Sequence, residues 1–285
     1  MAPRPIFLWG LGGAGLLALI AVALNKKDAI VTSFTSLTAG ISTAAFKATL
    51  PSRSEPYAQM LLDAADNNDV SPFLLWALLE RESRSGEALT PPGPAGTGDW
   101  APRSGKMPPD GKGWGRGLMQ LDWNSIAQQV DWADPKANIE AGAAHFASML
   151  RFFALVHGNK GMSIRWAKNG KYYQIGGPNA DYADPRPLSG NALTAAALAA
   201  YNTGQGNVLV SVAMGLDPDT TTAPGPTKSP DYSSDVLRRA EELLASYTAA
   251  TPSGVVTAST PAAAPAVADL SLDDLLNDPL PGGQS

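Results

Sequence analysis

The chain has 285 residues, of which 44% are hydrophobic, enough to bury one core and leave flanking segments outside it. A formal net charge of −5 argues against a sequence-independent grip on nucleic acid, which needs a basic surface. The absence of cysteine excludes disulfide bonds and thiolate chemistry. The only histidines, His145 and His157, are too few for a zinc site built from histidine ligands, and we expect no metal and no cofactor.

The N-terminal segment, residues 1–27, reads as a membrane anchor or a signal segment. Ile6–Leu24 is a run of 19 uncharged residues, just long enough to span a bilayer as a helix, and we predict an uncleaved anchor. The alternative is a signal peptide cleaved after Ala21-Val-Ala23. Residues 28–55 are predicted to form a stalk and linker.

The folded domain is predicted to cover residues 56–248 and to begin with a helix over Pro56–Asn67. The next helix, Ser71–Ser83, has a serine that suits its N-cap and a proline at its first position. Seven apolar residues then follow without a break, Phe73–Leu79, so this helix should be buried on nearly every side.

Two glutamates end this buried helix. Glu80 has a helical i,i+4 partner in Arg84, whereas Glu82 lies above leucines with no such partner. Desolvation there should raise the pKa of Glu82 and suit it to donating a proton near neutral pH. A solvated helix end is the alternative interpretation of the glutamate pair.

A long Gly- and Pro-rich segment, Arg84–Gly115, follows the glutamates, and a loop of this length is usually functional or mobile. It places two tryptophans, Trp100 and Trp114, among the cations Lys106 and Lys112. Aromatic rings beside cations suit sugars that carry acidic peptides. The alternative is that these side chains only hold the loop in place.

Three short patterns come next along the chain. Gly117-Leu-Met-Gln-Leu-Asp122 is predicted to be extended. Asn138-Ile-Glu-Ala-Gly142 lies on a helix predicted for Asp134–Val156. Ala199-Ala-Tyr-Asn-Thr-Gly204 closes a helix predicted for Asn191–Tyr201, which the glycine ends.

The remaining segments carry fewer signals. Gly158–Gly190 is an insertion, either a wall that holds a glycan or a plain surface hairpin. Helices are predicted over Gln205–Met214 and from Ser229-Pro230 to Tyr247. Residues 249–285 are rich in Ala and Pro, acidic, and predicted to be disordered. Within them, residues 270–280 alternate leucine with aspartate and form a candidate docking segment for a protein partner.

Taken in order, the Glu-Ser helix end, the Gly-Leu-Met-Gln turn, the Asn-Ile-x-x-Gly helix and the Ala-Tyr-Asn-x-Gly helix end resemble soluble lytic transglycosylases and goose-type lysozymes. The resemblance covers roughly Pro56–Val208. It implies a mainly α (α+β), lysozyme-like domain with a small extended region beside a cleft.

The same resemblance implies cleavage of the β-1,4 bond between N-acetylmuramic acid and N-acetylglucosamine in peptidoglycan. Glu82 takes the place of the catalytic acid. The positions that correspond to substrate-binding residues are Ser83, Gly117, Met119, Gln120, Tyr201 and Asn202. Together with the predicted anchor, this places the enzyme on a membrane facing peptidoglycan, in a bacterial envelope or a phage virion.

The resemblance covers two reactions. A lytic transglycosylase uses the muramic acid's own C6 hydroxyl and releases a 1,6-anhydro product. An inverting hydrolase needs a second carboxylate that holds a water. Asp122 stands where goose-type lysozymes have an aspartate, and Asp110 lies twelve residues upstream, although Asp122 also suits a local cap. We expect the transglycosylase, with the hydrolase or a phage structural and genome-delivery component as alternatives.

Overall fold

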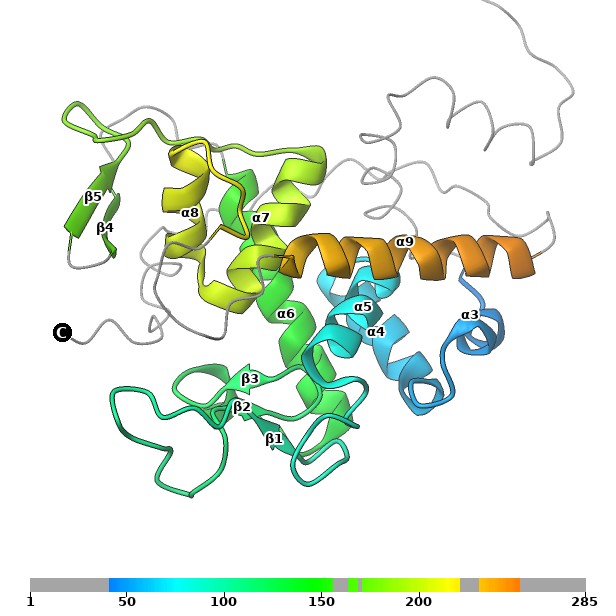
Figure 1. The fold of residues 1–285 in the computed structure, drawn as a ribbon. Helices are drawn as coiled ribbons and strands as arrows, with labels where there is room; N and C mark the ends of the chain where they lie inside the picture. Colours follow the sequence, from blue (N-terminus) through cyan, green and yellow to red (C-terminus); the bar gives the residue numbers. More distant parts are fainter. Residues whose placement is uncertain (1–40, 156–163, 169–170, 221–230, 252–285) are drawn as a thin grey trace, which may run out of the picture.

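The computed structural model describes residues 41–155, 164–168, 171–220 and 231–251. Within these ranges the protein is mainly α-helical with short strands, which confirms the predicted mainly α class (Figure 1). No helix in this part of the chain is long and apolar enough to cross a membrane. The predicted span, Ile6–Leu24, and the docking segment at residues 270–280 lie outside the described residues.

Helices make up most of the described part of the chain, and the strands are short. The helices are α3 Thr43–Thr49, α4 Ala58–Asn68, α5 Pro72–Ser83, α6 Pro135–Ala154, α7 Gly190–Thr203, α8 Gln205–Ala213 and α9 Tyr232–Ala250, with 3-10 turns η1 Glu55–Tyr57 and η2 Ile126–Gln128. The strands are β1 Thr97–Gly98, β2 Gly115–Arg116, β3 Leu121–Asp122, β4 Ile164–Lys168 and β5 Lys171–Ile175.

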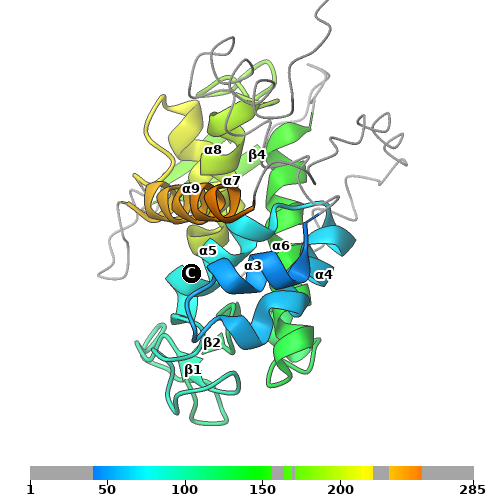
Figure 2. The same ribbon diagram turned by 90° about the vertical axis from the view of Figure 1, so that its right-hand side faces the viewer.

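Helix α5 is the buried centre of the fold, as its apolar run predicts. Ser71 accepts a hydrogen bond from the backbone N–H of Leu74 and caps the helix, and Pro72 occupies the first turn. Every residue from Pro72 to Glu80 is buried. Helix α4 packs against α5. Helix α9 crosses α5 and also contacts α3 and α7 (Figures 1 and 2).

Helix α6 connects the two ends of the molecule. It starts at a cap in which Asp134 accepts from the N–H of Ala137 at 2.7 Å. Its buried side packs against α4 and α7, and β3 lies near one end (Figure 1). Helix α7 ends at Gly204, whose φ of +84° favours glycine. These helices confirm the predicted ones to within two residues.

A small antiparallel sheet, in the order β1-β2-β3, forms from the predicted loop and extended segment. Gly115 pairs with Gly98 on one side and with Asp122 on the other. The segment predicted as an insertion contains the antiparallel pair β4-β5, which agrees with the hairpin alternative.

Two predicted boundaries need correction. The stalk predicted for residues 28–55 ends earlier, because Phe46 of α3 is fully buried and its ring contacts Phe73 edge-on, with 5.6 Å between centroids. The last helix begins at Tyr232, after the N-cap position Asp231, whereas Ser229 and Pro230 lie outside the described residues. It continues to Ala250, slightly past the predicted start of the tail.

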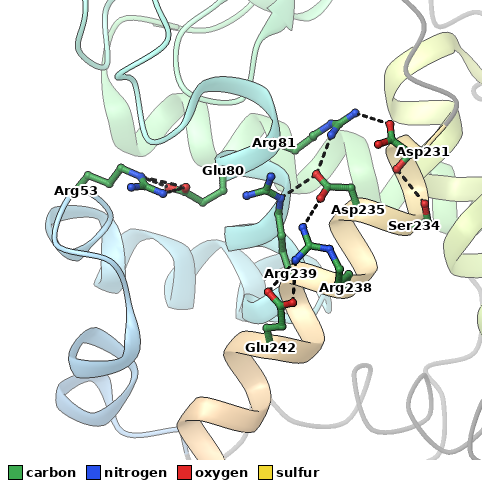
Figure 3. Close-up of polar contacts among 9 residues, drawn as sticks. All are labelled: Arg53, Glu80, Arg81, Asp231, Ser234, Asp235, Arg238, Arg239 and Glu242. Atoms are coloured by element: carbon green, nitrogen blue, oxygen red, sulfur yellow. Dashed lines mark hydrogen bonds and ion pairs between the residues drawn. The ribbon is translucent and has the colours of Figure 1, made fainter.

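The predicted ion pair between Glu80 and Arg84 is wrong. Helix α5 ends at Arg84, whose φ of +51° turns its side chain away from the i,i+4 position. Glu80 is buried and binds Arg53, whose Nη2 lies 2.6 Å from Oε2 (Figure 3). Burial alone would raise the pKa of Glu80, but hydrogen bonds from Arg53, Ser85 and Ser54 hold it below its ordinary value.

Glu80→Gln is expected to lower the free energy of unfolding by about 2–4 kcal/mol, because a buried charged acceptor is removed from Arg53 and two serine hydroxyls. Urea denaturation at neutral pH measures it. The difference from wild type should disappear as the pH falls through the lowered pKa of Glu80, since the carboxylate then protonates. Glu87→Gln, in an exposed pair with Arg84, is the control, and equal losses in both would contradict the prediction.

Candidate active site

Glu82 lies in the last turn of α5 and is partly buried. Burial raises the pKa of its carboxyl from the ordinary 4.5 to about 7, while a hydrogen bond from Tyr232 and the charge of Arg81 act in the opposite direction. The raised pKa that its position above the leucines predicted is therefore confirmed. Near neutral pH, Glu82 exists in both protonation states and can donate and take back a proton.

Tyr232 is a partner of Glu82 that the sequence did not indicate. Its hydroxyl donates to Oε1 of Glu82 from a position 150 residues further along the chain. The next residue holds it in place, because both the backbone N–H and the hydroxyl of Ser233 donate to the buried carboxylate of Asp219, at 3.0 and 2.8 Å. No local sequence pattern marks this pairing.

Arg81 fixes the start of α9 over the end of α5. Its guanidinium donates to Asp235 at 2.8 Å and to Asp231 at 3.1 Å (Figure 3). Its charged carbon also lies 5.4 Å from the centre of the Tyr232 ring. Burial would raise the pKa of Asp235, but hydrogen bonds from Arg239, Arg238 and Arg81 lower it to about 2. Tyr232 is thus held by Arg81 over its ring and, through the next residue, by the hydrogen bonds of Ser233 to Asp219.

The Gly-Leu-Met-Gln turn is held by Asn138 of α6, which is fully buried. Its Oδ1 accepts from the N–H of Met119 at 2.8 Å, and its Nδ2 donates to the carbonyls of Arg116 and Trp132 at 3.0 Å. A Cβ on Gly117 would lie 2.3 Å from that Nδ2. This explains why the turn combines glycine with an asparagine on the facing helix.

Gly142, the glycine of the Asn-Ile-x-x-Gly pattern, packs against Met119. Met119 is fully buried, and a Cβ added to Gly142 would lie 2.6 Å from its Cγ. The glycine therefore allows the turn to approach the helix closely. The two patterns, far apart in the sequence, form one packed unit that fixes the position of Gln120.

Tyr201 connects this turn to the acid. Its hydroxyl donates to the carbonyl of Met119 at 2.8 Å. Burial, together with the nearby charge of Glu82, raises its pKa well above the ordinary value, so it stays a neutral donor. Glu82, Tyr201 and Tyr232 thus form one cluster, contributed by α5, α7 and α9.

Gln120 follows Met119 at the end of the turn, and its side chain lies over the small sheet. It adopts a φ of +48°, and its Nε2 donates to the carbonyl of Gly117 at 2.8 Å. Its amide lies over Gly98 and Gly115, where an added Cβ would lie 2.2 and 2.3 Å from Oε1. Gln120 is partly exposed. Asn202 is exposed, and the described residues provide no hydrogen-bond partner for its side chain.

The other predicted substrate-binding residues are part of the scaffold in this structure. Ser83 is fully buried, where its hydroxyl donates to the carbonyl of Leu79 and accepts from the N–H of Gly86. Met119 is equally buried, and Gly117 is covered by Asn138. These contacts make the three residues part of the scaffold around the site, and their role in substrate binding stays a prediction.

Both candidate second carboxylates are bound by arginine. Asp122 accepts from Nη1 of Arg103 and, at 2.8 Å, from the N–H of Asn124, which agrees with the local capping alternative. Asp110 accepts from Arg116 at 2.9 Å, and this hydrogen bond lowers the pKa of its carboxyl. The lowered pKa makes Asp110 a weaker base.

Comparison with models of known protein families finds no match, and comparison with curated protein sequences finds none. The functional argument therefore depends on the residues and their geometry. They bring together an acid with a raised pKa, two tyrosine hydroxyls and a turn that presents an amide, which together can protonate an oxygen and bind a polar substrate.

Tyr232→Phe is expected to raise the pKa of Glu82 further, because a hydrogen bond that stabilises the carboxylate is removed. The change should be about one pH unit, the free energy of a modest hydrogen bond to a charged group. A carboxyl 13C titration of labelled protein measures it. Tyr182→Phe, in the segment after β5, is the control, and an unchanged titration in the Tyr232 variant would contradict the assigned hydrogen bond.

Proposed function

We propose that the protein is a lytic transglycosylase with a lysozyme-like fold. It cleaves the β-1,4 bond between N-acetylmuramic acid and N-acetylglucosamine in peptidoglycan. The observation that carries the proposal is the carboxyl of Glu82, whose pKa of about 7 suits general acid catalysis at the end of a buried helix. The substrate class comes from the resemblance of the four motifs, in their order along the chain, to lytic transglycosylases and goose-type lysozymes.

In this mechanism Glu82 donates its proton to the glycosidic oxygen as the bond from that oxygen to C1 of the muramic acid breaks. The C6 hydroxyl of the same sugar then attacks C1, and its proton passes to the carboxylate of Glu82. Tyr232 stabilises this carboxylate while the proton is absent, since its hydroxyl donates to Oε1. The partly exposed amide of Gln120 and the exposed amide of Asn202 bind the sugar.

The pairing of the aspartates favours this route over hydrolysis. Inverting hydrolysis needs a carboxylate free to accept a proton from water. Asp122 and Asp110 are each occupied by an arginine, Arg103 and Arg116, within hydrogen-bonding distance. The C6 hydroxyl needs no second carboxylate, because the acid itself takes the proton.

Analysis of released muropeptides by mass spectrometry tests the reaction. Purified sacculi digested with the enzyme should yield 1,6-anhydro products, each lighter by one water than the corresponding reducing product. Reducing ends from the start of the digestion would instead identify a hydrolase of the goose-type class. Failure to release any muropeptide would contradict both.

The proposal also includes membrane attachment through Ile6–Leu24, with the catalytic domain facing peptidoglycan and residues 270–280 available to a protein partner. Membrane fractionation followed by intact-mass measurement tests the attachment. An intact N-terminus in the membrane fraction is expected. A soluble product that begins at Leu24 would contradict it and indicate a secreted enzyme.

A further inference from the structure

Asp122 and the amide of Gln120 lie on the same face of the small sheet. Gly98, Gly115 and Asp122 are direct cross-strand partners, and the side chains of such partners project to one face. The Gln120 amide occupies this face, since it fills the positions where Cβ atoms of both glycines would lie. The Asp122 carboxylate therefore projects beside the group proposed to bind the sugar.

A single guanidinium restrains this carboxylate. Arg103 donates through Nη1 to Asp122 and through Nη2 to Asp99 at 2.8 Å, an arrangement that we call the Arg103 bridge (Asp99, Arg103 and Asp122). Its charged carbon lies 4.8 Å from the centre of the Trp114 ring, which keeps the side chain in place. The Trp114 indole in turn donates to the carbonyl of Ala101 at 3.1 Å.

The bridge is at the surface of the protein. The side chain of Arg103 is 41% exposed, whereas that of Asp122 is 23% exposed. Water reaches this side of the sheet, so that a nucleophile for hydrolysis is present. Both oxygens of Asp122 already accept a hydrogen bond, one from Arg103 and the other from the N–H of Asn124.

We propose that Arg103 determines the reaction outcome by preventing Asp122 from acting as a general base towards water. This inference rests on the proposed function and extends it to the choice between two nucleophiles. With Arg103 in place, the C6 hydroxyl attacks C1 and the anhydro ring forms.

Without Arg103, water can replace the C6 hydroxyl as the nucleophile. A water oxygen bonds to C1, one of its protons passes to Asp122, and Glu82 protonates the departing oxygen of the neighbouring sugar. The product then has a reducing end that contains the oxygen of the water. Arg103 acts through Asp122 and is a positioning residue, not a catalytic one.

Digestion of sacculi in water enriched in 18O distinguishes the two routes, because hydrolysis introduces one labelled oxygen and transglycosylation introduces none. Wild type is expected to give unlabelled anhydro products. Arg103→Gln is expected to raise the labelled share at least tenfold above the wild-type background. Arg103→Gln combined with Asp122→Asn should return the products to the wild-type pattern, a reversal that a merely structural role of Arg103 would not give.

Arg84→Gln, which removes an exposed guanidinium paired with Glu87, is the control and should leave the products unlabelled. Unlabelled products from an active Arg103→Gln enzyme would overturn the inference, as would label that persists in the double variant. If Arg103→Gln fails to fold, Arg103→Lys takes its place. Lysine cannot bridge both aspartates, so a rise is still expected, but a smaller one because lysine keeps the positive charge beside Asp122. Labelled reducing ends from wild type would instead contradict the proposed function itself.

Discussion

Glu82→Gln is expected to abolish peptidoglycan clearing, with a loss of about 10²- to 10⁴-fold in rate, the usual contribution of a positioned general acid. Glutamine keeps the shape of the side chain and still accepts from Tyr232, but it has no proton to give to the glycosidic oxygen. Zymography and turbidity assays measure the loss, and an unchanged circular dichroism spectrum shows that the fold is retained.

Glu80→Gln, the same substitution two residues earlier, is the matched comparison. The buried carboxylate of Glu80 is held ionised by Arg53, so that it has no proton to donate at neutral pH. Its variant should keep at least several per cent of the activity when assayed at low temperature, where the weakened fold persists. Loss of activity in the folded Glu80 variant, with activity retained in the Glu82 variant, would reverse the assignment of the acid.

The same Glu82 variant has a second expected effect, on stability. Because the folded-state pKa is raised to about 7 from 4.5, ionisation of Glu82 opposes folding, and the cost grows as the pH rises between these values. The free energy of unfolding of Glu82→Gln should therefore be about 2–3 kcal/mol higher than that of wild type at pH 8. Below pH 4.5 the two should not differ in this way. Parallel denaturant titrations at the two pH values measure it.

Local signals in the sequence account for the elements that were predicted well. A serine cap, a proline at the first turn and an unbroken apolar run specify α5 without reference to any other part of the chain. Gly204 marks the end of α7 in the same way, since its positive φ suits glycine. These signals act over about one helical turn, so they can be recognised from the sequence alone.

The partners of Glu80 and Glu82 could not be predicted from the sequence, because they come from distant segments. The i,i+4 rule paired Glu80 with Arg84, but the helix ends at that arginine in a left-handed conformation, where helical spacing no longer applies. Arg53 and Tyr232 reach the two carboxylates from opposite ends of the domain. Only the packing of α9 and of the segment before α4 on α5 brings them there.

Asn138→Ala is expected to reduce both stability and activity, because one buried amide serves three backbone groups. The N–H of Met119 loses its acceptor, and the carbonyls of Arg116 and Trp132 lose their donor. At about 1–3 kcal/mol for an unsatisfied buried group, with partial relaxation, the free energy of unfolding should fall by about 3–5 kcal/mol. Asn67→Ala, which removes an exposed amide bound to Glu140, should change it by less than about 0.5 kcal/mol.

A second substitution separates the position of the turn from overall stability. Gly142→Ala introduces a methyl group 2.6 Å from Cγ of Met119, so the turn must move away from α6 while its hydrogen bonds to Asn138 remain available. Because Tyr201 binds the Met119 carbonyl and Gln120 follows directly, this displacement should lower the rate at least tenfold with only a moderate loss of stability. Full activity in folded Gly142→Ala would show that the turn does not position the substrate.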